Sequence, residues 1–350
     1  MKYYLKEEFL HDVNAKNAGN KARNDVESIV KEEGYHPLVL SVDNWYQMST
    51  LTAQRHKAKA FGQALDQLKQ GDELLIQFPM LHHSFFSTHL VKKAQKRGIK
   101  VYLLIHDLEV LRHANMTSLP LKHRIRMYLQ EASFLKAADG IIAHNPVMKS
   151  VLVDKGIAAD KIVSLGIFDY LIPNFQEKSG QTKDQPMIVA GNLAQEKAGY
   201  LYALPAQPAY NLYGVGFDES RALENETYFG SFLPDELPAA LEGGFGLVWD
   251  GDSVETCSGV FGEYLRYNNS HKASLYLASG FPLVVWKQSA LSHFVLEKGC
   301  GITVESLHDL KATIENLSDE AYRTLVENAK RVGQEIRDGH YLKTALKHLA

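Results

Sequence analysis

A run of polar and aromatic residues in the second half of the chain has the composition of a ligand-binding loop. Residues 267–272 read Tyr-Asn-Asn-Ser-His-Lys, and a helix-compatible segment over residues 273–279 follows them. A loop that enters a helix presents backbone N–H groups without intrahelical partners and a partial positive charge, which suits a phosphate group. Lys272 would add a full charge near the first turn, and Ser274 would add a hydroxyl group. The run indicates an anion site; the competing interpretation is a surface helix with an asparagine cap and a solvated lysine.

A second candidate phosphate site comes earlier, where a new series of strands begins. A strand over residues 187–190 leads into a tight turn at Gly191 and Asn192, and Lys197 lies within the next helical turns. A glycine turn after a strand, with a lysine close behind, occurs at phosphate sites, but the motif alone is weakly specific. Residues 211–216, which include Tyr213, read as a further strand and glycine-rich turn.

The end of one strand in the first half gathers residues that could do acid–base chemistry. Residues 100–105 (KVYLLI) read as a buried strand, and His106, Asp107, Glu109 and Arg112 follow it closely. Groups just past the carboxyl end of a parallel strand lie where α/β folds bind ligands. Asp107 or Glu109 could act as general base toward an attacking hydroxyl group, and the residues alone do not choose between them. His106 could hydrogen-bond a sugar or a diphosphate, while Asp107 could equally cap the following turn.

Two patterns suggest a metal site, and other features disfavour both. The triplet at residues 250–252 (Asp-Gly-Asp) follows a strand, where a divalent ion would neutralise a leaving diphosphate. However, Asp-Gly-Asp is also a common turn, and this one lies late in the chain. His82, His83 and His89 are close in sequence, but no Cys, Asp or Glu completes a zinc ligand set at the usual spacing. We therefore expect no bound metal.

The composition excludes several classes of protein. The 350 residues are 45% hydrophobic and 23% charged, which is ordinary for a globular protein large enough for two domains. A net charge of −3 predicts no nucleic-acid partner, and the apolar runs are too short for a transmembrane segment. The acidic N-terminus lacks the apolar core of a signal peptide, and only two cysteines are present. A cytoplasmic, reducing location is expected.

Strand and helix signals alternate through the chain and then restart, which predicts an α/β protein with two Rossmann-like domains. The expected N-terminal domain covers residues 1–170, joined by a returning helix at 335–350, and the expected C-terminal domain covers residues 171–334. A polar stretch over residues 176–185 reads as the linker.

The first strand is followed by a polar loop that contains Asn17 and Gly19. A glycine in this loop lets a ligand approach the backbone closely in an α/β domain, although an ordinary connecting loop reads the same way. The loop is not G-x-G-x-x-G. The absence of this glycine motif argues against a nicotinamide dehydrogenase and against a nucleotide-sugar epimerase.

The run that begins at Tyr264 resembles the donor-site signature of a family of bacterial sugar transferases. The family includes the glucosyltransferases that extend O-linked N-acetylglucosamine on serine-rich-repeat adhesins, and related β-1,6-galactofuranosyltransferases. Ser270 stands where the family usually has proline, which removes no hydrogen-bond donor. The matching positions are Tyr264, Tyr267, Asn268, Asn269, His271, Lys272, Ser274, Tyr276, Leu277, Ala278, Gly280 and Pro282.

The resemblance implies the GT-B fold, in which two Rossmann-like domains with parallel sheets face each other across a cleft and the C-terminal helix crosses back to the N-terminal domain. It implies a donor site in the C-terminal domain and an acceptor site in the N-terminal domain. The implied acceptor-side residues are Asn17, Gly19 and Arg112, beside the candidate catalytic residues His106, Asp107 and Glu109. The implied donor-side residues are Gly191, Asn192, Lys197, Tyr213, Glu263, Tyr267, Asn268, Asn269, His271, Lys272 and Ser274.

The resemblance also implies an activity: transfer of a hexose, with glucose from UDP-glucose first, to a sugar hydroxyl without a cofactor or metal. The acceptor would be N-acetylglucosamine on an adhesin, or a growing polysaccharide if the donor is UDP-galactofuranose. A nucleotide-sugar-binding partner subunit without catalysis is the alternative outside enzymes. Relatives suggest a homo-oligomer. Aromatic residues at Tyr228 and Phe229 could stack on the uracil base or pack in the core.

Overall fold

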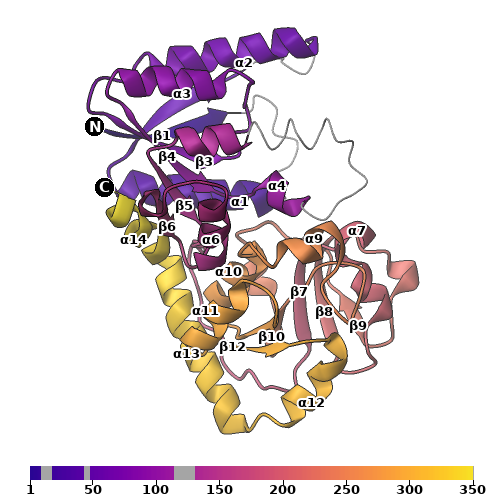
Figure 1. Cartoon of the computed structure of the whole chain (residues 1–350). Helices are drawn as coiled ribbons and strands as arrows, with labels where there is room; N and C mark the ends of the chain where they lie inside the picture. The colour runs from indigo at the N-terminus through magenta and orange to yellow at the C-terminus, as the bar shows by residue number, and fades with distance from the viewer. Residues whose placement is uncertain (9–17, 43–47, 114–130, 350) are drawn as a thin grey trace. The chain divides into compact units, whose positions relative to one another are not determined.

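The computed structural model describes residues 1–8, 18–42, 48–113 and 131–349, and it confirms the α/β prediction (Figure 1). The chain forms two compact units, each with a six-stranded sheet. Unit 1 contains the first strand, residues Arg23–Leu165 and the chain end from Leu342; unit 2 contains Gly166–Tyr341 and the first residues of α1. Every strand pair in both sheets is parallel. None of the helices in the described ranges is long and apolar enough to cross a membrane.

The sheet of unit 1 has the strand order β2-β1-β3-β4-β5-β6. Its central strands are continuous apolar runs because helices cover both faces of a parallel sheet. Thus β3, β4 and β5 are buried over nearly their whole length. The strands are β1 (Lys2–Glu8), β2 (His36–Ser41), β3 (Glu73–Phe78), β4 (Lys100–Ile105), β5 (Gly140–Ala143) and β6 (Ile162–Ser164).

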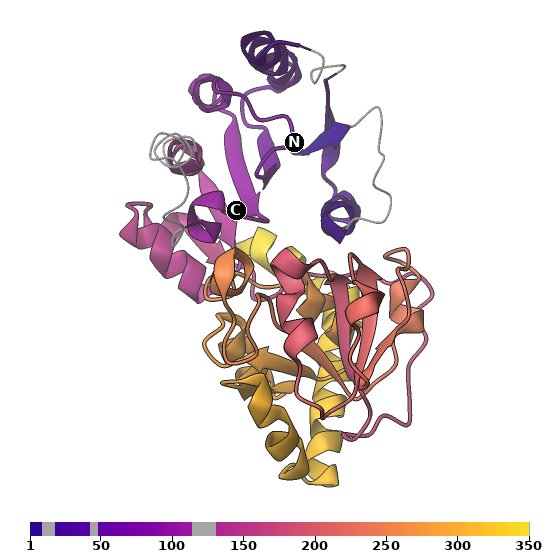
Figure 2. The same cartoon turned by 90° about the vertical axis from the view of Figure 1, so that its right-hand side faces the viewer.

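The helices of unit 1 lie on both faces of this sheet. The chain moves from β1 to β2 in one direction and from β2 through β6 in the other, so right-handed crossovers place α1 on the face opposite α2 and α3. Figure 2 shows this arrangement, with strands between α1 and the pair α2 and α3. The helices are α1 (Ala18–Glu32), α2 (Thr50–Leu65), α3 (Ser87–Lys96), α4 (Glu109–Arg112), α6 (Pro146–Asp154) and α14 (His340–Leu349), with a helical segment at residues 131–137 and a 3₁₀ turn at Ala159–Lys161.

The sheet of unit 2 has the strand order β12-β11-β10-β7-β8-β9. The strands are β7 (Met187–Asn192), β8 (Tyr210–Val215), β9 (Glu226–Tyr228), β10 (Phe245–Val248), β11 (Leu283–Trp286) and β12 (Gly301–Val304). The helices are α7 (Gln195–Ala198), α8 (Leu237–Ala240), α9 (Gly259–Tyr264), α10 (His271–Ala278), α11 (Leu291–Lys298), α12 (Leu310–Glu315) and α13 (Asp319–Arg337), with 3₁₀ turns at Gly199–Ala203, Glu219–Arg221 and Leu307–Asp309.

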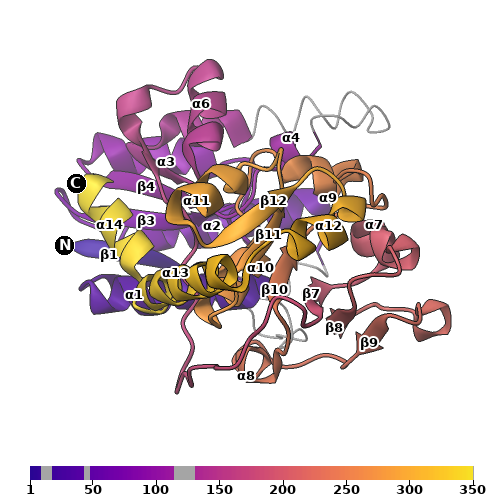
Figure 3. The same ribbon diagram turned by 90° about the horizontal axis from the view of Figure 1, so that it is seen from below.

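Helix α10 is held against the sheet and against α13 by close contacts. The Tyr276 hydroxyl accepts a hydrogen bond from the backbone N–H of Ala190 in β7, at 2.7 Å. A Cβ atom at Gly246 in β10 would lie 2.2 Å from the Tyr276 ring, so glycine is required where the ring crosses the strand. On the other side, a Cβ atom at Gly333 of α13 would lie 2.1 Å from the Leu277 carbonyl oxygen. The two helices lie side by side in Figure 3, and this packing fixes the position of the α10 N-terminus.

Two predicted elements differ from the structure, and a third lies mostly outside the described residues. The sequence predicts one helix over residues 318–349, but Gly339 adopts a positive φ of 70° and separates α13 from α14. The sequence predicts a helix that opens at His82, but α3 begins at Ser87 because turns at Met80 and Ser84 come first. The amphipathic helix predicted over residues 121–137 lies mostly outside the described residues, and its described part, residues 131–137, is helical.

The start of α4 is capped by a carboxylate from a distant part of unit 1. Glu131 accepts hydrogen bonds from the backbone N–H groups of Glu109 at 2.8 Å and Val110 at 3.0 Å. Burial raises the pKa of Glu131 to about 7, although these two hydrogen bonds favour its ionised form. Since α4 carries Glu109 and Arg112, this carboxylate positions one candidate catalytic residue and one candidate acceptor-side residue.

Replacing Glu131 with glutamine should change how the stability of the protein depends on pH. The folded-state pKa is about 7 and the ordinary value is 4.5, so the folded protein binds more protons between these values and the free energy of unfolding falls as pH rises through them. The Glu131→Gln variant lacks this titration, so its stability relative to wild type should improve between about pH 5 and about pH 8. Chemical denaturation at both pH values measures the difference. Glu33→Gln, at an exposed position of the same unit, is the control, and parallel pH profiles for wild type and Glu131→Gln would contradict the prediction.

Candidate functional site

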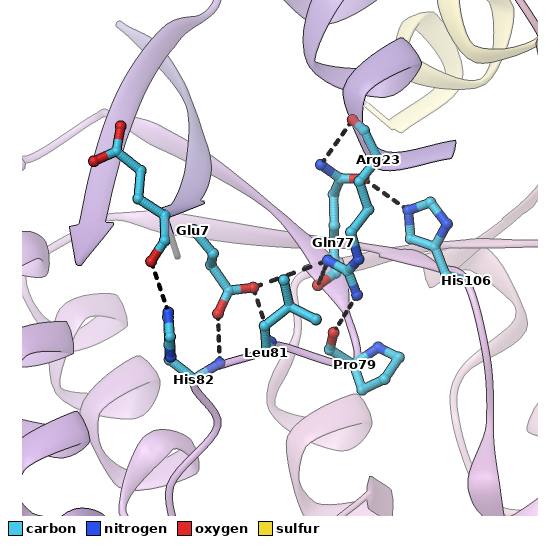
Figure 4. A network of polar contacts seen from close by, with 8 residues as sticks. Glu7, Arg23, Gln77, Pro79, Leu81, His82 and His106 are labelled. Carbon is cyan, nitrogen blue, oxygen red and sulfur yellow. Dashed lines mark hydrogen bonds and ion pairs between the residues drawn. The ribbon is translucent and has the colours of Figure 1, made fainter. Parts of the chain in front are cut away.

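The carboxyl ends of β1 and β3 in unit 1 are joined by a buried carboxylate (Figure 4). Glu7, near the end of β1, accepts hydrogen bonds from the backbone N–H groups of Leu81 at 3.0 Å and His82 at 2.7 Å. Burial raises the pKa of Glu7, while these hydrogen bonds and the nearby Arg23 guanidinium oppose that rise. The His82 ring bonds the carbonyl oxygen of Glu8 at 3.1 Å. The loop after β3 is therefore fixed to β1 at the edge of the sheet where α/β domains bind ligands.

The same network reaches the residue that follows β4. Arg23 of α1 donates to the carbonyl oxygens of Pro79 at 2.5 Å and Gln77 at 3.5 Å. The Gln77 amide nitrogen approaches the carbonyl oxygen of Arg23 at 3.4 Å, and its amide oxygen lies 2.7 Å from His106 Nε2. The backbone N–H of His106 also donates to the carbonyl oxygen of Phe78 at 2.7 Å. His106 is thus held by both its backbone and its ring.

The carboxylates predicted as candidate bases lie together around one guanidinium. Arg112 contacts Asp107 Oδ1 and Glu109 Oε1, both at 2.7 Å. Glu109 also lies 3.0 Å from His113 Nε2. Asp107 and Glu109 keep 37% and 34% of their side-chain surface exposed, so either can reach a ligand. The structure brings His106, Asp107, Glu109 and Arg112 to one place, as the sequence predicts, and still does not choose the base.

The predicted anion site of unit 2 lies at the start of α10. This helix begins at His271, two residues earlier than the sequence predicts. Ser270 occupies the N-cap position, but its side chain makes no capping hydrogen bond. Lys272 is not the solvated lysine of the competing interpretation. Its ammonium group donates to the carbonyl oxygen of Trp249 at 3.0 Å and to Asp250 Oδ1 at 2.7 Å, and both charged side chains are at most 10% exposed.

Several other predicted donor-side residues surround this helix start. Asn269 donates to the carbonyl oxygen of Gly166 at 2.7 Å, and the His271 ring packs on Phe168 with centroids 4.8 Å apart. Two buried polar atoms, Asn268 Oδ1 and Ser274 Oγ, find no hydrogen-bond partner among the described residues. Buried oxygens in that condition cost free energy unless a ligand or water satisfies them, so a water or a polar ligand is expected near the first turns of α10. Tyr267 lies half-buried in the turn that precedes the helix.

The tight turn predicted at Gly191 and Asn192 is wrong, because both residues belong to the end of β7 and pair with the end of β8. Gly191 has a φ of 123°, and a Cβ atom at Gly214 in the neighbouring strand would lie 1.8 Å from the Gly191 carbonyl oxygen. The side-chain oxygen of Asn192 already accepts a hydrogen bond from the backbone N–H of Ala194 at 2.9 Å. The Lys197 ammonium lies 5.2 Å from the Phe261 ring centroid.

Two further donor-side candidates are occupied by contacts within unit 2. Tyr213 is fully buried, and its hydroxyl accepts from the backbone N–H of Glu242 at 3.1 Å, so it packs in the core of unit 2. Its ring stacks on Phe229, which is 42% exposed, with centroids 4.9 Å apart. Glu263 binds Arg266 at 2.8 Å through the guanidinium Nε.

The residues of the two metal patterns have other contacts. Asp250 pairs with Lys272, and Asp252 accepts from the Ser258 hydroxyl. His83 packs edge-on against Phe134, and burial lowers its pKa to about 4. Within the described ranges, no three His, Cys, Asp or Glu residues are grouped as a metal site.

Sequence reasoning missed Glu7, Arg23, Gln77 and Glu131. One signal could have found Gln77, because it is a single polar residue near the end of the apolar strand ELLIQF. Of the acceptor-side predictions, Asn17 lies outside the described residues and Gly19 lies in the first turn of α1.

Family models and a curated relative match nearly the whole length of the chain. The model of the Glucosyltransferase 3-like N-terminal domain matches residues 2–167, and that of the Glucosyltransferase 3-like C-terminal domain matches residues 187–349. The β-1,6-galactofuranosyltransferase WbbI of Escherichia coli K12 is 33% identical over 97% of both chains.

Solved structures show the same fold at low sequence identity. A sucrose-phosphate synthase from Thermosynechococcus elongatus is similar with a TM-score of 0.65 and 13% identity, over 99% of this chain and 98% of that one. Anabaena Alr3699/HepE in complex with UDP and glucose is similar with a TM-score of 0.56 and 12% identity, over the same shares. The chain therefore belongs to the Glucosyltransferase 3-like family and is a glycosyltransferase of the GT-B type.

Proposed function

We propose that this glycosyltransferase moves a hexose from a UDP-sugar to a sugar hydroxyl without a metal ion, with UDP-glucose as the first candidate donor. The observation that carries the proposal is the start of α10, where Lys272 is buried and the Ser274 hydroxyl lacks a partner among the described residues. The family match supports a glucosyl donor, and the complex of HepE with UDP and glucose supports a uridine nucleotide. The acceptor we propose is N-acetylglucosamine linked to a protein.

The diphosphate of the donor would bind at the N-terminus of α10. Backbone N–H groups of the first turn point out of the helix, and the helix dipole favours an anion there. An ammonium group has three N–H donors. Trp249 and Asp250 accept two of those of Lys272, so one is left for a phosphate oxygen among the contacts described. A fixed cation at this place would stabilise the negative charge that develops on the departing UDP.

The acceptor hydroxyl would lose its proton to a group at the end of β4. A general base must lie within hydrogen-bond reach of that proton and be unprotonated when the hydroxyl attacks. Asp107 and Glu109 are half-exposed, and their shared contact with Arg112 keeps a cation beside both carboxylates. His106 lies next to them and would orient the acceptor or take the proton itself.

A second candidate is transfer of galactofuranose during polysaccharide synthesis. The observation that favours it is the 33% identity to WbbI over 97% of both chains. The site described above would bind the diphosphate of either donor, so its geometry fits both reactions.

The experiment that tests the proposal supplies UDP-glucose or UDP-galactofuranose with a GlcNAc-bearing peptide or an oligosaccharide, and measures UDP release and product mass. We expect UDP release that requires an acceptor and continues in EDTA. Binding of a UDP-sugar without release would indicate a partner subunit without catalysis. Activity lost in EDTA and restored by manganese would overturn the metal-independent mechanism.

Removing the charge of Lys272 should weaken donor binding. Lys272→Ala alone would leave Asp250 buried and unpaired, which costs about 3–5 kcal/mol, so the informative variant is Lys272→Met with Asp250→Asn. Loss of a charge-assisted hydrogen bond of about 1.5–3 kcal/mol predicts at least about a 10-fold rise in the Kd for the UDP-sugar, measured by calorimetry. Lys287→Met, at an exposed surface pair with Glu305, is the control. An unchanged Kd in the double variant would show that the diphosphate binds elsewhere.

Separate substitutions should identify the base. Asp107→Asn and Glu109→Gln preserve size but cannot accept a proton, and loss of general-base catalysis typically lowers kcat by about 10²–10⁴-fold. We expect this drop in Asp107→Asn with an unchanged Kd for the donor, and a smaller drop in Glu109→Gln. Full turnover in Asp107→Asn together with a large loss in Glu109→Gln would assign the role to Glu109. Full turnover in both would remove the pair from the reaction.

A further inference from the structure

We propose that Gln77 is a positioning residue that holds the ring of His106 in one orientation and in one tautomer, with the proton on Nε2. The part of this inference that concerns turnover rests on the proposed role of His106, and the part that concerns the tautomer does not. The contact between Gln77 and His106 is not part of the backbone ladder of β3 and β4. The last two pairs of that ladder are Gln77↔Leu104 and Phe78↔Ile105, one position before His106.

The chemistry of its neighbours fixes which way the Gln77 amide points. The Gln77 amide lies between two groups. Its Nε2 atom is 3.4 Å from the carbonyl oxygen of Arg23, and its Oε1 atom is 2.7 Å from Nε2 of His106. A backbone carbonyl can only accept a hydrogen bond, so the NH₂ end must face Arg23. The reversed amide would place two carbonyl oxygens against each other. The Gln77 oxygen therefore faces the imidazole ring.

That orientation determines where the imidazole proton lies. An amide oxygen can only accept, so His106 Nε2 must donate. A neutral imidazole carries one N–H, so the lone pair is on Nδ1, and Nδ1 is the atom that gains a proton when the ring ionises. If His106 accepts a proton during the reaction or accepts a hydrogen bond from a sugar hydroxyl, Nδ1 is the atom that does so.

The remainder of the network keeps Gln77 in place (Figure 4). The side chain is 5% exposed, and its own carbonyl oxygen accepts from Arg23 Nη1 at 3.5 Å. Arg23 in turn lies 3.9 Å from the buried Glu7 carboxylate, which binds the loop after β3 through two backbone N–H groups. The ring torsion of a histidine is broad when nothing restrains it. A buried glutamine whose amide makes two hydrogen bonds removes that freedom before a substrate binds. Such preorganisation accelerates the reaction of a bound substrate.

The tautomer is measured directly by nitrogen NMR of protein labelled with ¹⁵N-histidine, with the His106 signals assigned by their loss in His106→Ala. We expect the Nε2–H form in wild type and in Gln77→Glu, whose carboxylate still accepts from Nε2. Gln77→Leu removes the acceptor and should lower the share of the Nε2–H form. Gln95→Leu is the matched control, since Gln95 also bonds a backbone carbonyl and a side chain in unit 1. A wild-type proton on Nδ1, or an unchanged tautomer in Gln77→Leu, would overturn the assignment.

Turnover tests whether this orientation matters for the reaction. One neutral hydrogen bond is worth about 0.5–1.5 kcal/mol, so Gln77→Leu should lower kcat by about 2- to 13-fold with the KM for UDP-glucose unchanged. Gln77→Glu should recover part of the loss, and Gln95→Leu should show none. If kcat is unchanged in Gln77→Leu while the tautomer shifts, Gln77 does not position a reacting group. If His106→Ala keeps full kcat, the proposed role of His106 fails, and the NMR result still decides the tautomer.

Discussion

The buried pair of Lys272 and Asp250 is the interaction on which the proposed donor site depends. A lysine that is only 10% exposed loses most of its hydration, and such a cost is tolerated when a carboxylate and further acceptors replace the water. Asp250 and the carbonyl oxygen of Trp249 supply both at the end of β10. The pair therefore sets a cation beside the first turn of α10 before any ligand arrives. The packing of Tyr276 against Gly246, and of Leu277 against α13, is what holds the helix close enough for the pair to form.

Unit 1 also contains a buried charge that needs compensation, and there the charge is negative. Glu7 is a buried carboxylate at the end of a strand, and two backbone N–H groups and a nearby guanidinium compensate its charge. In both units the buried charge lies at the carboxyl edge of a parallel sheet, where loops diverge and backbone groups lack ladder partners. Charges placed there order the loops that carry the candidate site residues. In unit 1 the ordered residue is His106, and in unit 2 it is the start of α10.

The sequence predicted the two α/β halves because their strands are apolar runs that alternate with helical periodicity. It also predicted that His106, Asp107 and Glu109 would lie together, since residues that follow one strand must share its end. It could not predict the partner of Lys272, because Asp250 is 22 positions away and meets it only after α10 packs on β10. Tyr213 shows the same limit, because an aromatic residue in a strand can face a ligand or the core and only the packing decides.

The Asp250-Gly251-Asp252 triplet shows how strongly the surroundings determine the use of a motif. Two aspartates separated by a glycine could coordinate a divalent ion if both were directed at one point. Here Asp250 binds an ammonium group at 2.7 Å, and Asp252 accepts from the Ser258 hydroxyl. A metal at Asp250 would have to displace Lys272 and leave a buried ammonium group without its counter-ion, a change that costs several kcal/mol. In the proposed mechanism the lysine takes the position that a metal would need, and the positive charge beside the donor would come from a side chain instead of an ion.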